Sequence, residues 1–184
     1  MKSTYDDKSW SFLIADVDLE DDIFSHSVIL VLEDSPNASF GIILNKPIYK
    51  TLGQMNPNFI NTPLANIPTF IGGPVCPDKF SIVIFHKDEK ENKSNFSFGV
   101  KADFAENYKK DHPTAKIVAF MGYSSWKAGQ LQAEIKDKTW LTSPVNEDFI
   151  LIEDGENIWK KAICSIKKIY TKFPKPFGLD YRQN

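Results

Sequence analysis

One short stretch of this chain places an aromatic ring, an amide and a carboxylate at helical spacing. Trp126, Gln130 and Glu134 follow one another at intervals of four residues, so on a helix, at about 100° per residue, they share one stripe. A carboxylate beside an amide can bind a cationic group, but general acid–base catalysis also requires a second titratable partner. The stripe therefore predicts either a groove for a ligand or partner, or a structural tie in which Gln130 and Glu134 hydrogen-bond to neighbouring backbone.

Asn45, Gly72 and Gly73 are further candidates for ligand or partner binding. Consecutive glycines can present their backbone N–H groups to an anion as a nest. A phosphate-binding loop also requires a lysine and a following helix, and the sequence around Gly72 shows neither. The alternative for the glycines is a tight turn before Pro74, and Asn45 is the polar side chain that we expect beside the Trp126 stripe.

Ser124 has the sequence position of a nucleophile but not the surroundings of one. It follows a predicted strand and precedes a predicted helix, as the serine of a nucleophile elbow does. The strained turn of that elbow requires a glycine two residues after the serine, and this chain has Trp126 there. We therefore predict that Ser124 or Ser125 caps the helix, and we predict no catalytic residue.

The acidic segment 16–22 offers hard oxygen ligands at close spacing, without the pattern of a known metal loop. An EF-hand requires glycine at its sixth position and glutamate at its twelfth, where this chain has Asp21 and Ser27. The histidines lie far apart and have no zinc-ligand spacing. We predict a solvated acidic loop, no metal site and no cofactor.

One face of a predicted helix over 156–170 carries four lysines: Lys160, Lys161, Lys167 and Lys168. Phosphate binding requires several cations on one exposed surface, so this face is the candidate for nucleic-acid binding. The formal net charge of -2 and the pI near 5.9 give no global reason to expect such binding. No helix-turn-helix or RNA-binding signature accompanies the lysines, and the solvated face of an amphipathic helix is the alternative.

Length and composition predict one globular domain in the cytoplasm. The chain has 184 residues, of which 42% are hydrophobic and 25% charged, which is ordinary for a globular protein. Residues 1–10 lack the apolar core of a signal peptide, and no apolar run approaches the ~20 residues that span a bilayer. Cys76 and Cys164 match no metal or redox spacing, which favours a reducing compartment. We therefore expect a soluble cytoplasmic protein that does not act in a membrane.

The elements that must position these residues are hairpins interspersed with a few helices. Apolar runs predict strands at 11–15, 27–32, 39–44, 80–85, 96–100 and 115–121, and helices are predicted at 51–55, 102–110 and 156–170. Residues 122–125 are expected to turn sharply from a strand into the helix that carries Trp126. Because most strands follow one another as neighbours, we predict an α+β fold with a mixed, largely antiparallel sheet.

Other segments are assigned by their turn residues and charge. Pro47 is expected to end a hairpin, because proline cannot donate to a ladder. We expect an irregular run at 56–68, a solvated loop at 86–95, an extended segment at 140–141, and a last strand or docking segment at 149–152. The domain boundaries that we predict are a flexible lead-in at 1–10, a single domain at 11–171 and a tail at 172–184.

Four longer motifs are spread along the chain. They are Phe24-Ser25-His26-Ser27-Val28-Ile29-Leu30, Phe40-Gly41-Ile42-Ile43-Leu44-Asn45-Lys46-Pro47, Gly72-Gly73-Pro74-Val75 and Gly122-Tyr123-x-x-Trp126-x-x-Gly129-Gln130-Leu131-x-x-Glu134-Ile135. Together they resemble the YqgE/AlgH family of bacterial proteins, over about 12–169. The resemblance implies a small cytoplasmic protein in which a strongly bent sheet is flanked by helices. It implies no established activity, and the label of transcriptional regulator that some members carry comes from genetics and indicates no known DNA-binding site.

The chain also departs from the pattern of that family. His26 and Lys46 stand where the resemblance implies arginine, and Val17 stands where it implies proline. An arginine could clamp a carboxylate or a phosphate with two hydrogen bonds, whereas histidine and lysine cannot. Ser124 and Ser125 replace smaller residues, so a serine chemistry would not be a family property.

These observations lead to three hypotheses about function. The first is a non-enzymatic cytoplasmic protein that binds a protein partner or a small ligand in a binding or regulatory role, because no coherent catalytic set is present. The second is a nucleic-acid-binding transcriptional regulator that uses the lysine face of the last helix. The third is an enzyme with a site around Trp126, Gln130 and Glu134.

Overall fold

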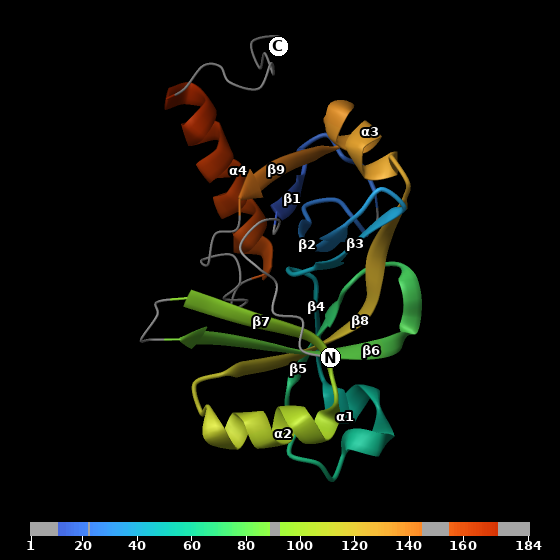
Figure 1. Cartoon of the computed structure of the whole chain (residues 1–184), viewed down its shortest axis with the longest axis vertical. Coiled ribbons are helices and arrows are strands. Elements are labelled where there is room, and N and C mark those ends of the chain that lie inside the picture. The colour runs from blue at the N-terminus through green and yellow to red at the C-terminus, as the bar shows by residue number, and fades with distance from the viewer. Residues whose placement is uncertain (1–10, 22, 89–92, 145–154, 173–184) are drawn as a thin grey trace.

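The computed structural model describes residues 11–21, 23–88, 93–144 and 155–172. In chain order they form β1 (Ser11–Ala15), β2 (Val28–Asp34), β3 (Ala38–Ile43), β4 (Pro47–Thr51), α1 (Leu52–Met55), the 3-10 helix η1 (Pro57–Phe59), β5 (Pro68–Ile71), β6 (Val75–Asp88), β7 (Lys93–Val100), α2 (Ala102–Asp111), β8 (Lys116–Lys127), α3 (Gln130–Lys136), β9 (Trp140–Pro144) and α4 (Gly155–Lys172). The strands join into one curled sheet, with α1 and α2 at one end and α3 and α4 at the other (Figure 1). The predicted single-domain α+β fold is confirmed.

Strand β8 connects the two halves of the sheet. Its residues 116–121 pair antiparallel with β6, and residues 119–121 also pair parallel with β5. Its residues 124–127 pair antiparallel with β3, from which the sheet continues through β2 and β1 to β9. The ribbon of β8 accordingly runs from the lower to the upper half of the molecule (Figure 1). One strand thus belongs to both halves, and its parallel pairing with β5 makes the sheet mixed.

The predicted sharp turn at 122–125 is wrong, because β8 continues through it to Lys127. Ser124 and Trp126 are buried whereas Ser125 and Lys127 are exposed, and this period of two is typical of a strand with one covered face. The antiparallel ladder with β3 provides hydrogen-bond partners for the backbone here, so no turn is required.

Trp126 therefore lies on a strand and not on the helix that carries Gln130 and Glu134. The predicted capping by Ser124 or Ser125 is also wrong. The residue before α3 is Gly129, with φ 73°, and glycine adopts this left-handed conformation without the steric cost of a side chain. The three side chains therefore do not form one helical stripe: Trp126 lies on β8 and faces Gln130 and Glu134 on α3.

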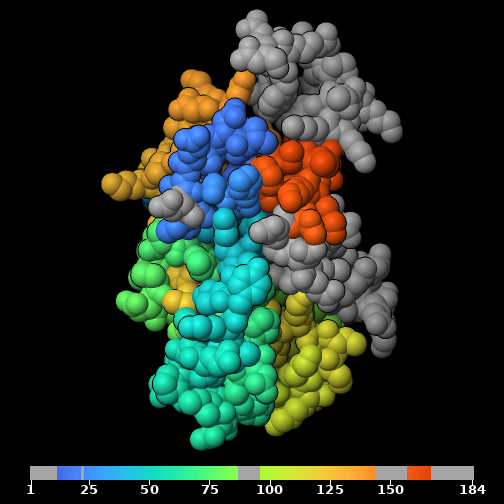
Figure 2. All heavy atoms as spheres, turned by 180° about the vertical axis from the view of Figure 1, so that it is seen from behind, coloured from blue at the N-terminus to red at the C-terminus, as the bar shows by residue number. Residues whose placement is uncertain are grey.

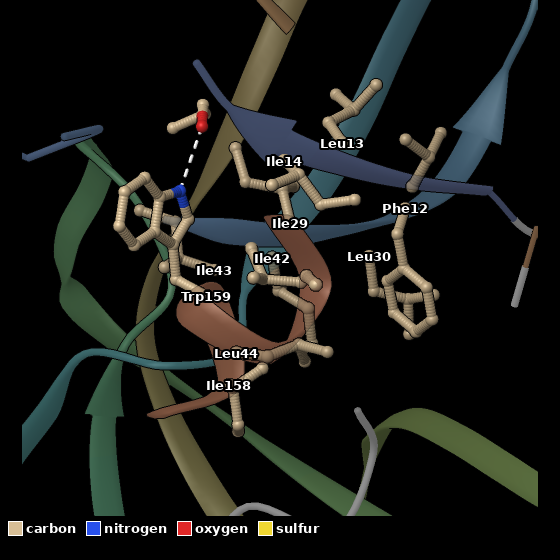
Figure 3. Close-up of a cluster of buried hydrophobic side chains, with 14 of the residues drawn as sticks. Phe12, Leu13, Ile14, Ile29, Leu30, Ile42, Ile43, Leu44, Ile158 and Trp159 are labelled. Atoms are coloured by element: carbon tan, nitrogen blue, oxygen red, sulfur yellow. Dashed lines mark hydrogen bonds between the residues drawn. The ribbon is translucent and has the colours of Figure 1, made fainter. Parts of the chain in front are cut away.

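The main core lies between β1, β2, β3 and helix α4. Figure 3 shows labelled apolar side chains of β1 and its neighbouring strands beside α4, with Leu13 pointing away from the helix. The indole N–H of Trp159 donates a hydrogen bond to the carbonyl of Ala15 at 2.8 Å, which ties α4 to the end of β1. The amphipathic helix predicted at 156–170 is thereby confirmed.

A smaller core lies at the other end, where α1 and α2 cover β6 and β8. It includes Leu52, Leu64, Ile82 and Ala105. The short helix predicted through Met55, with Thr51 as its cap, is confirmed. The helix predicted at 102–110 is also confirmed and ends one residue later, at Asp111. Within the described ranges, no helix combines the length and the hydropathy that a bilayer crossing requires.

The predicted chain breaks have different outcomes. The hairpin of β2 and β3 ends before Pro47, as predicted, and Pro47 then opens β4, which pairs with β5 at the edge of the sheet. The loop expected at 86–95 is shorter, because β6 runs to Asp88 and β7 begins at Lys93. The lead-in 1–10, the segment 149–152 and the tail from 173 onward lie outside the described residues.

Candidate functional site

Glu134 is the centre of the site predicted around Trp126. Its Oε2 accepts hydrogen bonds from the indole N–H groups of Trp126, at 2.9 Å, and Trp140, at 2.7 Å. Its Oε1 accepts a hydrogen bond from Nε2 of Gln130 at 2.9 Å, and Oε1 of Gln130 in turn accepts the backbone N–H of Lys127 at 3.0 Å. Three side-chain donors, from β8, β9 and α3, therefore converge on one carboxylate.

This arrangement ties α3 to two strands. Trp126 and Trp140 are 4% and 3% exposed, and their rings pack edge to face with centroids 6.2 Å apart. A buried indole N–H requires an acceptor, and a carboxylate is a strong one. Gln130 bonds to the neighbouring backbone, as the structural alternative expected, whereas Glu134 accepts from two indoles and an amide instead. The geometry supports the structural alternative, and ligand binding by Trp126, Gln130 and Glu134 stays a prediction.

Asn45 lies elsewhere, buried just beyond the end of β3. Its Oδ1 accepts the backbone N–H of Val28 and its Nδ2 donates to the carbonyl of His26, both at 2.8 Å. The neighbouring Lys46 donates from Nζ to the carbonyl of Ser25 at 2.7 Å. The structure thus places Asn45 against the segment 25–28, and not beside Trp126 as the sequence suggested.

Gly72 and Gly73 lie buried where the chain crosses β8 at Gly122. A Cβ on Gly72 would lie 2.4 Å from the carbonyl oxygen of Gly122, and a Cβ on Gly122 would lie 2.3 Å from that of Gly73. The N–H of Gly72 donates to the carbonyl of Met121 at 2.7 Å, so it is not available to an anion. The close contact between backbones explains the glycines, and their role in ligand binding stays a prediction.

An open hollow lies at the segment that Asn45 and Lys46 hold. It has a volume of about 690 Å³ and is lined by Val17, Leu19, Glu20, Asp21, Ser25 and His26. The ring of the exposed His26 packs edge-on against Trp159 of α4, with centroids 4.3 Å apart. Figure 2 shows the blue residues of this part of the chain at the surface beside the orange-red residues of α4.

The hollow brings two of the four motifs together. Ser25 and His26 of the first motif line it, and Asn45 and Lys46 of the second motif bind their carbonyls. The sequence did not reveal this site, because the spacing of residues along the chain does not show that 45–46 lie close to 25–28. The only signal was that both His26 and Lys46 depart from the arginine that the family resemblance implies.

A second, smaller hollow lies between the β2–β3 turn and α3. Its volume is about 370 Å³, and it is lined by Asp34, Ser35, Pro36, Gly129 and Gln132. Nε2 of Gln132 donates to both carboxylate oxygens of Asp34, at 3.1 and 3.2 Å. Asp34 and Gln132 are thus engaged with each other, and Oγ of Ser35 donates to the carbonyl of Ala38 at 2.8 Å.

The lysine face predicted on the last helix is described only in part. Lys160 and Lys161 are exposed on α4, on the side opposite the buried Ile158 and Ile163. The side chains of Lys167 and Lys168 lie outside the described residues. Nucleic-acid binding by this face stays a prediction.

Two solved structures have a similar fold. The solution structure of the AlgH protein from Pseudomonas aeruginosa has a TM-score of 0.64 at 22% identity, covering 92% of this chain and 95% of that one. The crystal structure of a protein from Corynebacterium diphtheriae has a TM-score of 0.63 at 20% identity, covering 91% of this chain and 87% of that one. At these identities the likeness concerns the fold alone.

Sequence comparison extends the likeness to a family. The chain is 33% identical over 175 residues to a UPF0301 protein of Parabacteroides distasonis, covering 90% of this chain and 87% of that protein. It is 32% identical over 166 residues to a UPF0301 protein of Vibrio vulnificus, covering 83% of this chain and 88% of that protein. The family model described as AlgH-like matches residues 12–171. As the four motifs predicted, the chain belongs to the AlgH-like family.

Proposed function

We propose that this protein is a non-enzymatic cytoplasmic binding protein whose ligand or partner docks in the hollow at residues 17–26. The observation that carries the proposal is the convergence of two motifs on the wall of that hollow. Asn45 and Lys46 each donate a hydrogen bond to a backbone carbonyl of the wall. A wall that is held in place before binding loses less conformational entropy when a ligand arrives.

The chemistry of the wall suits a positive charge attached to an apolar group. Glu20 and Asp21 supply carboxylates, and Val17 and Leu19 supply apolar surface. The carboxylate of Asp21 is held by two backbone N–H groups of its own loop, both at 2.8 Å from Oδ1. We therefore expect the hollow to take an amine or a guanidinium, carried either by a small ligand or by a partner's side chain.

Glu134 has no role in this proposal. Its Oε2 already accepts two indole N–H groups, and its Oε1 accepts the amide of Gln130. A general base would need a free lone pair directed at a substrate proton and a partner with which to exchange it. The carboxylate that most resembled a catalytic group is thus engaged in holding α3.

Backbone amide NMR of the full chain tests the proposal. An alkylamine and an alkylguanidine are expected to shift the amides at 17–26, whereas an alkyl carboxylate of equal length is not. A lysine-rich peptide is expected to bind more tightly than free lysine if the physiological occupant is a protein, and no more tightly if it is a small ligand.

Variants make this test specific to the hollow. Glu20→Gln removes one charge of the wall and is expected to weaken binding of both cations severalfold. Gln132→Ala, in the second hollow, is the matched control and is expected to leave binding unchanged. Shifts that do not depend on ligand charge, or that are equal in Glu20→Gln, would refute the proposal.

A further inference from the structure

A second cluster of polar side chains lies at the α2 end of the molecule. It consists of His86, near the end of β6, and of Tyr108 and His112, at the end of α2. Nδ1 of His86 and the hydroxyl oxygen of Tyr108 are 2.8 Å apart. The ring centroids of His86 and His112 are 4.5 Å apart, with an angle of 45° between the planes. All three side chains are half-buried, so water and ions have access to them.

Local hydrogen bonds hold His112 opposite His86. Its N–H donates to the carbonyl of Tyr108 at 2.8 Å, and its own carbonyl accepts the N–H of Ala115 at 2.9 Å. Nζ of Lys109 donates to the carbonyl of Pro113 at 2.8 Å, which secures the next residue of the turn. These bonds fix the backbone at His112, and its ring lies against the rings of Tyr108 and His86, with centroids 4.3 and 4.5 Å away.

The separation of the rings fits a shared metal ion. With nitrogen–metal bonds of ~2.1 Å, the centroids of two coordinating imidazoles lie roughly 4.6 Å apart at a right angle between the bonds and roughly 5.3 Å apart at a tetrahedral angle. The 4.5 Å between His86 and His112 requires only a small outward movement of the rings. In the tautomer with its proton on Nδ1, His86 donates to the hydroxyl oxygen of Tyr108 and leaves Nε2 for the ion. Metal-binding histidines likewise donate their other ring N–H to an oxygen acceptor.

We propose that His86 and His112 bind a divalent transition-metal ion such as Zn²⁺, with Tyr108 as a positioning residue for His86. Imidazole nitrogen suits zinc, nickel and copper, whereas magnesium and calcium require oxygen ligands. Across the described ranges no three His, Cys, Asp or Glu side chains gather to hold a metal, so water or an external ligand completes the coordination. The site is independent of the hollow proposed above, and the sequence could not suggest it because the two histidines lie far apart in the chain.

Zinc titration of the full chain tests this site. Cys76 and Cys164 are exposed thiols that also attract zinc, so Cys76→Ser/Cys164→Ser serves as the background. Calorimetry is expected to show one zinc ion bound per chain and no binding of Mg²⁺. Of the three histidines, the ring NMR signals of His86 and His112 are expected to shift, whereas those of His26 are not.

Three variants separate metal binding from simple ring stacking. His112→Gln and Tyr108→Phe are each expected to weaken zinc binding by at least about tenfold, the second with both histidines present. Lys110→Gln, an exposed position of the same helix, is the control and is expected to bind as tightly as the background. Urea unfolding without zinc verifies that each variant folds. Unchanged zinc affinity in His112→Gln, or binding that requires the thiols, would overturn the proposal.

Discussion

Replacing Glu134 with alanine removes the common acceptor of two buried indole N–H groups. A buried donor left without an acceptor costs about 1–3 kcal/mol. Because Glu134 is only half-buried, water can reach part of this site, and we expect the free energy of unfolding to fall by about 2–4 kcal/mol. Glutamine keeps one oxygen for the indoles but turns an NH₂ group towards the amide of Gln130, so we expect a smaller loss of about 1–2 kcal/mol.

Urea unfolding, followed by tryptophan fluorescence and by circular dichroism, measures both losses. Glu33→Gln, an exposed position of β2, is the control and is expected to change the free energy by less than about 0.5 kcal/mol. In a double-mutant cycle, Trp140→Phe and Glu134→Gln are expected to show a coupling of about 1 kcal/mol, because they remove the two ends of one hydrogen bond. If both Glu134 variants lost less than about 0.5 kcal/mol, the carboxylate would not tie α3 to the sheet.

The remaining predictions concern the strand crossing, the wall of the hollow and the lysine face. Gly122→Ala is expected to lower the free energy of unfolding by more than about 3 kcal/mol in the same urea assay. Gly99 has a similar φ but nothing within 4 Å of an added Cβ, so Gly99→Ala is expected to cost only about 1 kcal/mol. Equal losses would contradict the role of the crossing. Asn45→Ala is expected to cost about 2–3 kcal/mol, because the buried N–H of Val28 and the partly buried carbonyl of His26 lose their partner. A loss near zero would show that water replaces the side chain. In anisotropy titrations at low and high salt we expect no binding of duplex or single-stranded DNA; salt-sensitive binding that weakens in Lys160→Gln/Lys161→Gln would instead favour the nucleic-acid hypothesis.

The helices at 102–110 and 156–170 could be predicted because the period of their apolar residues is a local property. The end of β8, the strand that carries Trp126, could not be predicted in the same way. Glycine and serine at 122–125 favour a turn when they are considered alone, but pairing with β3 keeps this segment extended. A contact between segments far apart in the chain thus overrode the local preference.

The candidate site shows the same division. The motifs indicated which residues matter, and Trp126, Gln130 and Glu134 do meet in space. Their common role was not evident, because Trp140, the second indole on the carboxylate, lies outside all four motifs. The position of Asn45 beside the hollow could likewise not be predicted from the sequence, because it depends on the end of β3 lying next to the start of β2.

By itself the sequence determined the family, the α+β class and the amphipathic helices, because composition, motifs and short periods depend only on residues that are close together in the chain. Only the tertiary structure decided that β8 joins both halves of the sheet, that the glycines serve a crossing of backbones, and that His86 faces His112. The physical reason is that strand register and the approach of distant side chains are set by packing among residues far apart in the chain, which no local pattern reports.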